Sequence, residues 1–536
     1  MPVPHVYPEG CVFNKLSDIQ GKHITVMGLG LNGGGEEAVR FFLKHGAYVT
    51  VTDMKTAEQL EPTIASLSKD TTLDKSKLTY VLGQHRVEDF STADCVIKNP
   101  GVKYEGNKYL AEAKAIETDI SIFLHFTKSP IIAVTGSKGK SSTVSAIDFG
   151  LREAGFTSFL GGNITVSPLT FLEKTDGTTP VVLELSSWQL ADLRGRNSLK
   201  PKIAIITKIV PDHQNWYGDM DSYVEDKKLI YKNQTKEDFT ILDFDEDDYL
   251  KDSACPKLNC KCWGDLFASE TKGTVLRYSK KPMPTTVFGV WQKQTKDGVI
   301  GMERLPENLM SQYAQKHGIS EEQIMGSLYV PGDHMKVNVL NAALTQRLMG
   351  ISPEQTIAIM SSWKGIPHRL EHFLTWTYKN DNSISRDVLF YNDSCATVPE
   401  AAAAASQSFE RRVILITGGT DKGLDFLPLA KAIAGENSSY EPLETYMLSG
   451  TGTDKITPLL DSRHIPYEGP FDSLEVLLGV LKANIMSSDS EKVYGVPDKT
   501  KPLVVVFSPG ATSFGMFQNE FDRGDKFKQE VKNIFQ

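Results

Sequence analysis

Cysteine is scarce in this sequence. Six occur in 536 residues, at positions 11, 95, 255, 260, 262 and 395. This low density excludes a small disulfide-stapled scaffold and is typical of a reducing compartment. Cys255, Cys260 and Cys262 form a C-x4-C-x-C cluster, whereas structural zinc sites usually contain C-x2-C pairs. We therefore interpret these three residues as thiols near a loop rather than as metal ligands.

Long apolar runs and an excess of basic charge are also missing. No stretch of roughly 18 or more apolar residues occurs, so we expect no transmembrane helix and no membrane partner. Residues 1–8 lack the basic start and apolar core of a signal peptide, which indicates a cytoplasmic protein. The 58 basic and 67 acidic residues give a net charge of −9, which argues against a nucleic-acid partner. Local loops can still bind phosphate in an acidic protein.

The length and composition favour several α/β domains. Apolar residues make up 40% of the chain, and about 150 residues per domain suggests three or four domains. Three β-branched runs, at 23–28, 131–136 and 413–419, each lead into glycine and then a helical pattern, which is typical of βαβ units with parallel strands. Further buried strands are predicted at 181–185, 203–206 and 503–507. We predict α/β domains at 1–128, 129–364 and 365–536, with insertions on the central domain at 234–330.

The first glycine-rich loop is Gly28-Leu-Gly-Leu-Asn-Gly33, which matches G-x-G-x-x-G. Asp53 follows 20 residues beyond Gly33, at the end of a predicted strand. Such glycines let backbone N–H groups approach a diphosphate, and the acid can accept hydrogen bonds from a ribose or base. A dinucleotide or a UDP-sugar would both fit this pattern. A glycine turn that only packs helix on strand is the plain alternative.

The second glycine-rich loop runs from Thr135 to Ser142 and contains Gly139-Lys140-Ser141 after a strand. In a P-loop the backbone cradles phosphates, the lysine neutralises charge and the serine can reach Mg²⁺. Val134 stands where the strict P-loop pattern has its first glycine. We nevertheless predict ATP binding here, and the alternative is a solvated basic turn.

Acidic and histidine side chains follow the next two predicted strands. Glu184 ends one strand, Asp212-His213 follows another, and Lys227 lies 14 residues beyond His213. Alone, a strand-end acid is often a helix cap and a histidine is often structural. Carboxyl ends of parallel strands meet at one edge of a sheet, so together with the P-loop these residues indicate a metal–nucleotide site.

These motifs, in this order, resemble those of the Mur ligases, the ATP-dependent amino-acid ligases of peptidoglycan precursor synthesis. The resemblance spans nearly the whole chain and also rests on Gly332-Asp-His with Asn338, Pro367-His-Arg369, Asn392-Asp393-Ser and Gly418-Gly-Thr-Asp-Lys422-Gly. The segments 99–102, 184–189, 421–426 and 508–513 are most similar to members that add glutamate to UDP-N-acetylmuramoyl-L-alanine. The resemblance implies an N-terminal Rossmann-like UDP-binding domain, a central P-loop ATPase-type domain and a C-terminal Rossmann-like domain. It also implies ATP, Mg²⁺ and an acyl-phosphate intermediate, and we expect a monomer.

The resemblance assigns roles to individual residues. Catalytic roles fall on Lys140, Glu184, His213, Lys227 and Lys422. The nucleotide would be held by Thr135, Gly136, Ser137, Lys138, Gly139, Lys140, Ser141, Ser142, Asn338, Arg369 and Asp393. The metal ligands would be Ser141, Glu184, His213 and a carbamylated Lys227, for which a surface lysine is the alternative. The UDP-muramoyl substrate would meet Leu31, Asn32, Asp53, Gly101, Asn163, Ser187 and Gln189, and the incoming amino acid Thr397, Lys422, Ser513 and Phe514.

Three C-terminal positions depart from the family pattern. Cys395 replaces a lysine, Gly515 replaces an aspartate, and Glu520 stands where an aromatic residue is frequent. We interpret Cys395 as a small residue rather than a nucleophile. These departures leave open whether the added amino acid is D-glutamate, L-glutamate or another. Folylpolyglutamate synthase, a nicotinamide oxidoreductase and a non-catalytic nucleotide-binding homologue are the competing interpretations.

Overall fold

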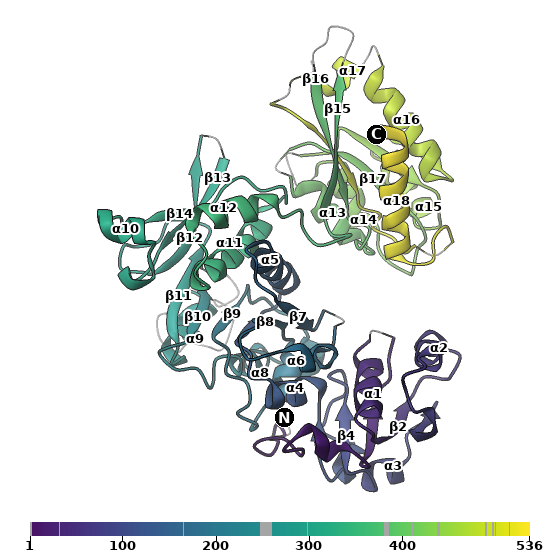
Figure 1. Cartoon of the computed structure of the whole chain (residues 1–536). Helices are drawn as coiled ribbons and strands as arrows, with labels where there is room; N and C mark the ends of the chain where they lie inside the picture. Colours follow the sequence, from purple (N-terminus) through teal and green to yellow (C-terminus); the bar gives the residue numbers. More distant parts are fainter. Residues whose placement is uncertain are drawn as a thin grey trace. The chain divides into compact units, whose positions relative to one another are not determined.

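The computed structural model of the protein describes residues 3–31, 33–164, 166–246, 260–296, 298–379, 385–409, 411–436, 440–487, 490–495, 498, 500–513 and 515–536. They form three separate sheets with helices between the strands, so the predicted α/β class is confirmed (Figure 1). Among these residues, no helix combines the length and the apolar character needed to cross a bilayer.

The N-terminal sheet is parallel, with strand order β3-β2-β1-β4-β5. The strands are β1 (His23–Met27), β2 (Tyr48–Asp53), β3 (Leu78–Leu82), β4 (Cys95–Lys98) and β5 (Ile116–Glu117). The helices are α1 (Gly34–Lys44), α2 (Glu61–Lys69), α3 (Val87–Ser91) and α4 (Asp119–Phe126). The loop from 28 to 33 therefore joins β1 to α1, as a phosphate-binding turn requires.

The central sheet has nine strands in the order β14-β13-β12-β11-β10-β9-β6-β8-β7. They are β6 (Ile131–Thr135), β7 (Phe159–Gly162), β8 (Val181–Glu184), β9 (Ile203–Ile206), β10 (Phe239–Asp243), β11 (Thr274–Ser279), β12 (Gly289–Thr295), β13 (Gly298–Arg304) and β14 (Glu322–Met325). Every residue of β6, β8 and β9 is buried, because helices cover both faces of a parallel sheet. The central helices are α5 (Lys140–Glu153), α6 (Ser187–Ala191), α7 (Gln214–Tyr217), α8 (Met220–Lys228), α9 (Trp263–Glu270), α10 (Gln312–His317), α11 (Asp333–Leu348) and α12 (Pro353–Ser362).

The segment 234–330 differs from the expected insertions. It supplies β10 to β14, which extend the central sheet by five strands. Two of these strand pairs, β12 with β13 and β13 with β14, are antiparallel. The outer strands β12 and β13 combine apolar and polar residues and are partly solvent-exposed, so they lack the fully buried apolar runs that revealed β6, β8 and β9.

The C-terminal sheet has the order β15-β16-β20-β17-β18-β19. Its strands are β15 (Glu371–Lys379), β16 (Ser385–Asn392), β17 (Ile414–Gly418), β18 (Glu444–Leu448), β19 (Glu468–Phe471) and β20 (Leu503–Phe507). The β15–β16 pair is antiparallel, and the other strand pairs described in this sheet are parallel. The helices are α13 (Pro399–Gln407), α14 (Leu427–Ile433), α15 (Thr453–Asp461), α16 (Leu474–Met486), α17 (Ser490–Tyr494) and α18 (Glu520–Phe535).

The chain divides into two compact units. The first contains residues 1–327 and 337–360, and the second contains residues 328–336 and 361–536. In the first unit one apolar core runs without a break from Phe13 and Phe42 under the N-terminal sheet to Leu183 and Leu242 of the central sheet. The division at 128 and the domain ranges derived from the sequence stay a prediction.

Candidate functional site

The second glycine-rich loop joins β6 to α5, and two of its glycines hold conformations that other residues avoid. Gly136 has φ +143° and Gly139 has φ +94°. A Cβ on Gly136 would lie 2.0 Å from Thr207 Oγ1, and one on Gly139 would lie 2.4 Å from Asn338 Oδ1. The second distance places Asn338, a predicted nucleotide ligand on α11, directly against the loop.

The first turn of α5 is arranged to receive an anion. Gly139 caps the helix without a side-chain hydrogen bond, and the first turn contains no acidic residue. Lys140 folds back over the loop, where its Nζ donates to Gly136 O at 2.9 Å and to Ser137 O at 3.0 Å. Burial lowers the pKa of Lys140. Uncapped N–H groups, the helix dipole and an ammonium group all favour bound phosphate at this position.

Other side chains of this loop have different surroundings. Thr135 is buried, and its hydroxyl donates to Leu185 O at 2.7 Å. Ser137 is also buried and donates to Val210 O at 2.9 Å. Ser141 and Ser142 are half-buried, whereas Lys138 is exposed. The hydroxyls of Thr135 and Ser137 therefore hold the loop in place.

Glu184 ends β8 and is only 1% exposed. One carboxylate oxygen, Oε1, accepts a hydrogen bond from Asn163 Nδ2 at 2.8 Å. The other, Oε2, is buried and has no hydrogen-bond partner among the described atoms. A buried carboxylate oxygen without a donor is costly, so the position fits a bound cation.

Lys227 lies in the last turn of α8 and is 1% exposed. Its Nζ donates to Gly136 O at 2.9 Å and lies 4.5 Å from the centre of the Tyr223 ring. Burial, followed by the charge of Lys140, lowers the pKa of Lys227 well below its ordinary value of 10.5. The predicted surface-lysine alternative does not fit this burial.

His213 sits at the start of α7 in a left-handed conformation, with φ +51°. Its ring packs against Trp188 at 4.8 Å and lies 6.2 Å from Tyr223. Within the described ranges, no three His, Cys, Asp or Glu side chains are grouped as a metal site. Glu184 and His213 would therefore need a further ligand, and a carbamate on Lys227 together with the Ser141 hydroxyl would supply oxygen ligands of the kind Mg²⁺ prefers. The unpartnered oxygen of Glu184 is the observation that makes the set fit this ion.

A cavity of about 290 Å³ lies between the first glycine-rich loop and the central sheet. Gly28, Asn99, Gly101, Asn163 and Gln189 are among its lining residues. Three predicted acceptor residues, Gly101, Asn163 and Gln189, are thus brought together, although they come from three different connections. We call this space the acceptor cavity. Asn163 also donates a hydrogen bond to Glu184, so its amide group links the acceptor cavity to the carboxylate.

The remaining predicted acceptor residues lie elsewhere or are not described. Ser186 lines the acceptor cavity, whereas Ser187 is buried in α6 and does not. Leu31 is 51% exposed and is not a lining residue. Asp53 accepts hydrogen bonds from the backbone N–H groups of Leu29 at 2.9 Å and Gly30 at 3.2 Å, so its carboxylate holds the glycine loop. Asn32 falls outside the described residues.

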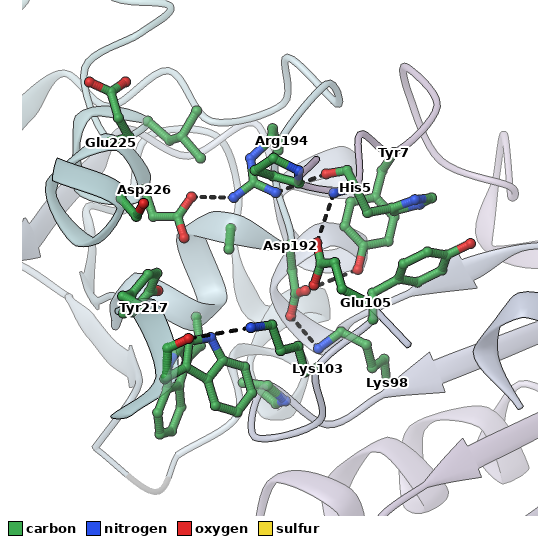
Figure 2. Close-up of a pocket in the computed structure, with 18 of the residues that line it drawn as sticks. His5, Tyr7, Lys98, Lys103, Glu105, Asp192, Arg194, Tyr217, Glu225 and Asp226 are labelled. Atoms are coloured by element: carbon green, nitrogen blue, oxygen red, sulfur yellow. Dashed lines mark hydrogen bonds and ion pairs between the residues drawn. The ribbon is translucent and has the colours of Figure 1, made fainter. Parts of the chain in front are cut away.

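A second cavity, of about 600 Å³, lies beside the acceptor cavity (Figure 2). Aromatic side chains and several charged residues line it, including Tyr104, Trp188, Trp216, Arg194 and Asp226. Lys98, Pro100 and Trp188 line both cavities and therefore form the wall between them. No motif in the sequence indicated this second cavity.

In the second unit, hydrogen bonds join the loops that follow β16, β17 and β20. Gly510 N donates to Ala396 O at 2.9 Å, and Thr512 N donates to Thr420 O at 3.0 Å. The predicted amino-acid residues Thr397, Lys422 and Ser513 lie on these three loops, and Lys422 is exposed. Phe514 falls outside the described residues.

The predicted nucleotide residues of the second unit differ in exposure. Arg369 is exposed, whereas Asp393 is buried and accepts hydrogen bonds from Leu370 N at 3.1 Å and Ser508 Oγ at 2.7 Å. Burial raises the pKa of Asp393 to about 7. Burial also raises the pKa of the Cys395 thiol, which agrees with its interpretation as a small residue and not a nucleophile.

Comparison with known proteins identifies the family. Residues 22–122 match the Mur ligase MurD-like N-terminal domain, and residues 134–264 match the Mur ligase middle domain. The UDP-N-acetylmuramoylalanine–D-glutamate ligase of Treponema pallidum is 38% identical, over 97% of this chain and 99% of that protein. The chain belongs to the Mur ligase family. The ligase of the same name from Borreliella burgdorferi strain ZS7 is 37% identical over the same shares.

A solved structure supports the Mur ligase fold. A crystal structure of MurF from Acinetobacter baumannii aligns with a TM-score of 0.53 at 12% identity, covering 99% of this chain and 100% of that one. At this identity the likeness concerns the fold alone.

Several residues of this Mur ligase site escaped the sequence analysis. Arg523 is 1% exposed and donates to Ala511 O at 2.9 Å and Ser394 O at 2.8 Å, which ties together two loops of the amino-acid region. Lys98 and Asp192 form a buried ion pair beside the acceptor cavity. The one available signal for Lys98 was its position before Asn99-Pro-Gly, and a charged residue at a strand end does not by itself indicate burial.

Proposed function

We propose that this chain ligates D-glutamate to UDP-N-acetylmuramoyl-L-alanine, using ATP and an acyl-phosphate intermediate, in peptidoglycan precursor synthesis. One contact carries the proposal, the hydrogen bond from Asn163 to Glu184. Asn163 lines the acceptor cavity, and Glu184 lies within the electrostatic reach of the P-loop lysine Lys140. An acceptor carboxylate and a nucleotide phosphate would therefore meet at this point.

Two anions have to approach each other in the first step. The acceptor carboxylate oxygen attacks the terminal phosphorus, and ADP leaves. We assign Lys140 and the N-terminus of α5 to the phosphate, because both are positive and partly shielded from water. Asn338 lies against Gly139 and would contact the nucleotide from the same side.

Glu184, His213, Ser141 and a carbamylated Lys227 are proposed as the metal-binding set. When bound, Mg²⁺ would shield the charges of the triphosphate. Lys227 has the two properties that carbamate formation needs: burial, and a pKa lowered well below 10.5. Asn163 restrains the Glu184 carboxylate by occupying its other oxygen.

The second step needs a neutral amine and a leaving phosphate. The amine of glutamate attacks the activated carbonyl carbon, phosphate departs and one proton is lost. We assign the exposed ammonium group of Lys422 to a carboxylate of the incoming glutamate, with which it can form a charge-assisted hydrogen bond. Thr397 and Ser513, on hydrogen-bonded loops beside it, would complete the contacts. The cytoplasmic location and the monomeric state stay predictions.

The test is a ligation assay in which each of the three reactants is omitted in turn. ADP and a new amide, read by mass, should appear only with ATP, UDP-N-acetylmuramoyl-L-alanine and glutamate together. Parallel reactions with D- and L-glutamate identify the added enantiomer. If only L-glutamate reacts, the proposed amino-acid substrate is wrong. ATP turnover that ignores both other reactants would contradict the proposal.

A further inference from the structure

The acceptor cavity has walls from two different sheets. Asn99 and Gly101 follow β4 of the N-terminal sheet, whereas Gln189 lies on α6 after β8 of the central sheet. The turn containing Asn99 and Gly101 is closed by the hydrogen bond from Gly101 N to Asn99 Oδ1 at 3.0 Å. The spacing of these walls depends on whatever joins the turn to the helix.

Lys98 makes that connection. It is the last residue of β4, and its side chain is only 2% exposed. Its Nζ donates to Asn99 O at 3.1 Å and to Val102 O at 2.7 Å, and it forms an ion pair with Asp192 Oδ2 at 2.9 Å. Its ammonium group therefore makes two hydrogen bonds to backbone carbonyls and one ion pair with a carboxylate. One buried group thus holds both ends of the turn and the end of α6.

The N-terminal segment completes this arrangement. Tyr7 donates its hydroxyl hydrogen to Asp192 Oδ1 at 3.1 Å, and its backbone N donates to Arg194 O at 2.8 Å. Figure 2 shows the Lys98, Asp192 and Tyr7 side chains directed toward one another. Asp192 therefore accepts a hydrogen bond on Oδ1 and pairs with the Lys98 charge through Oδ2, and a segment that precedes the first strand covers this ion pair.

We propose that Lys98 is a positioning residue for the acceptor substrate, acting through the Asn99–Gly101 turn and through Asp192. This inference rests on the proposed function for the identity of the acceptor. Lys98 also lines the cavity, but its ammonium group is already bonded to two backbone carbonyls and its charge is paired with Asp192, so it sets the separation of the walls instead of supplying charge to the ligand. Loss of Lys98 should weaken acceptor binding and leave ATP binding unchanged.

The chain contains a matched control. Arg196 and Glu117 form another buried ion pair, at 2.8 Å, with side chains 2% and 3% exposed. This pair also links the N-terminal sheet to the segment after α6, and Arg196 lies 4.6 Å from the centre of the Tyr7 ring. Neither residue lines the acceptor cavity. The two pairs therefore have similar structural roles but different positions relative to the substrate.

The experiment compares Lys98→Met, the double variant Lys98→Met/Asp192→Asn and the control Arg196→Met/Glu117→Gln in the full chain. Removing one partner of a buried pair strongly destabilises a protein, whereas neutralising both partners restores much of that stability. Thermal unfolding and the KM values for UDP-N-acetylmuramoyl-L-alanine and ATP are measured for each. Both Lys98 variants should raise the acceptor KM roughly tenfold or more, with the ATP KM within about twofold of wild type.

The double variant separates positioning from simple stability. It should regain thermal stability relative to Lys98→Met and still show the raised acceptor KM, because Asn99 O and Val102 O remain without their donor. The control should lose stability with an acceptor KM within about twofold of wild type. Recovery of the acceptor KM together with stability, an equal effect in the control, or an equal rise in the ATP KM would overturn the inference.

Calorimetric titration of UDP-N-acetylmuramoyl-L-alanine distinguishes this inference from the proposed function. If wild-type protein binds the acceptor with the same dependence on Lys98 but forms no amide, the function fails and the positioning role stands. If wild-type protein forms the amide and Lys98→Met/Asp192→Asn binds the acceptor normally, the positioning role fails and the function stands.

Discussion

Replacing Lys227 by methionine tests the chemistry of the buried amine. Lys227 is 1% exposed, and burial together with the charge of Lys140 lowers its pKa well below 10.5. At pH 7.5 an ordinary lysine of pKa 10.5 keeps about 0.1% of its amine neutral, and each unit of lowering raises that fraction about tenfold. Lys227 is therefore prepared to react with CO₂, forming an N–C bond and releasing a proton.

The carbamate changes the sign of the charge beside Lys140. When both are protonated, the ammonium groups of Lys227 and Lys140 repel each other. A carbamate on Lys227 would instead attract the Lys140 ammonium and complete the ligand set of Glu184 and His213. Lys227→Met should therefore reduce turnover by at least roughly 100-fold, as loss of a buried charge-stabilising group does elsewhere. Stability should change by only about 1 kcal/mol, because Gly136 O keeps its hydrogen bond from Lys140 at 2.9 Å.

The assay combines ADP release with ¹³C NMR after incubation in labelled bicarbonate. Wild-type protein should show a carbamate signal that Lys227→Met lacks. Lys228→Met is the control, since Lys228 is the next residue but pairs with Glu225 and Glu270 at 2.6 and 3.0 Å. Wild-type turnover in Lys227→Met, or full activity without a carbamate signal, would refute the reasoning.

Three further predictions concern the nucleotide loop and the second unit. Lys140→Ala should abolish ADP formation while the calorimetric acceptor affinity stays unchanged, and wild-type turnover would exclude its phosphate role. Gly139→Ala should lower the free energy of unfolding by about 1–3 kcal/mol and raise the ATP KM, because φ is +94° and the new Cβ would lie 2.4 Å from Asn338 Oδ1; an unchanged ATP KM would contradict this. The pKa of Asp393 rises from 3.8 to about 7 on folding, so the native state binds its proton more tightly and stability should fall as pH rises from 4 to 7. Asp393→Asn should reduce the dependence of the unfolding free energy on pH, measured by urea unfolding. An unaltered dependence would show that other groups cause it.

Much of the fold could be predicted because its strands are buried on both faces. The runs that became β6, β8, β9 and β20 contain only buried residues, and apart from the terminal Thr135 and Glu184 each is continuous and apolar in the sequence. The outer strands β12 and β13 have mixed exposure and left no such signal.

The candidate site was predictable to a similar, partial degree. The family resemblance assigned Gly101, Asn163 and Gln189 to the acceptor, and all three line one cavity, although their roles stay predictions. Asp53 shows the limit of that reasoning: its carboxylate is occupied by the backbone of its own loop, which no residue spacing could distinguish from binding a ribose.

By itself, the sequence determined the chemical groups available, the glycine turns and the positions of the buried strands along the chain. These follow from local backbone preferences and from hydrophobic periodicity, which act over a few residues. Only the tertiary structure decided which oxygen of Glu184 lacks a donor, that Lys227 is buried beside Lys140, and that Lys98 meets Asp192 from 94 residues away. Burial and pairing of this kind depend on packing between distant segments, because the same side chain has a different charge state and partner in water than in a closed core.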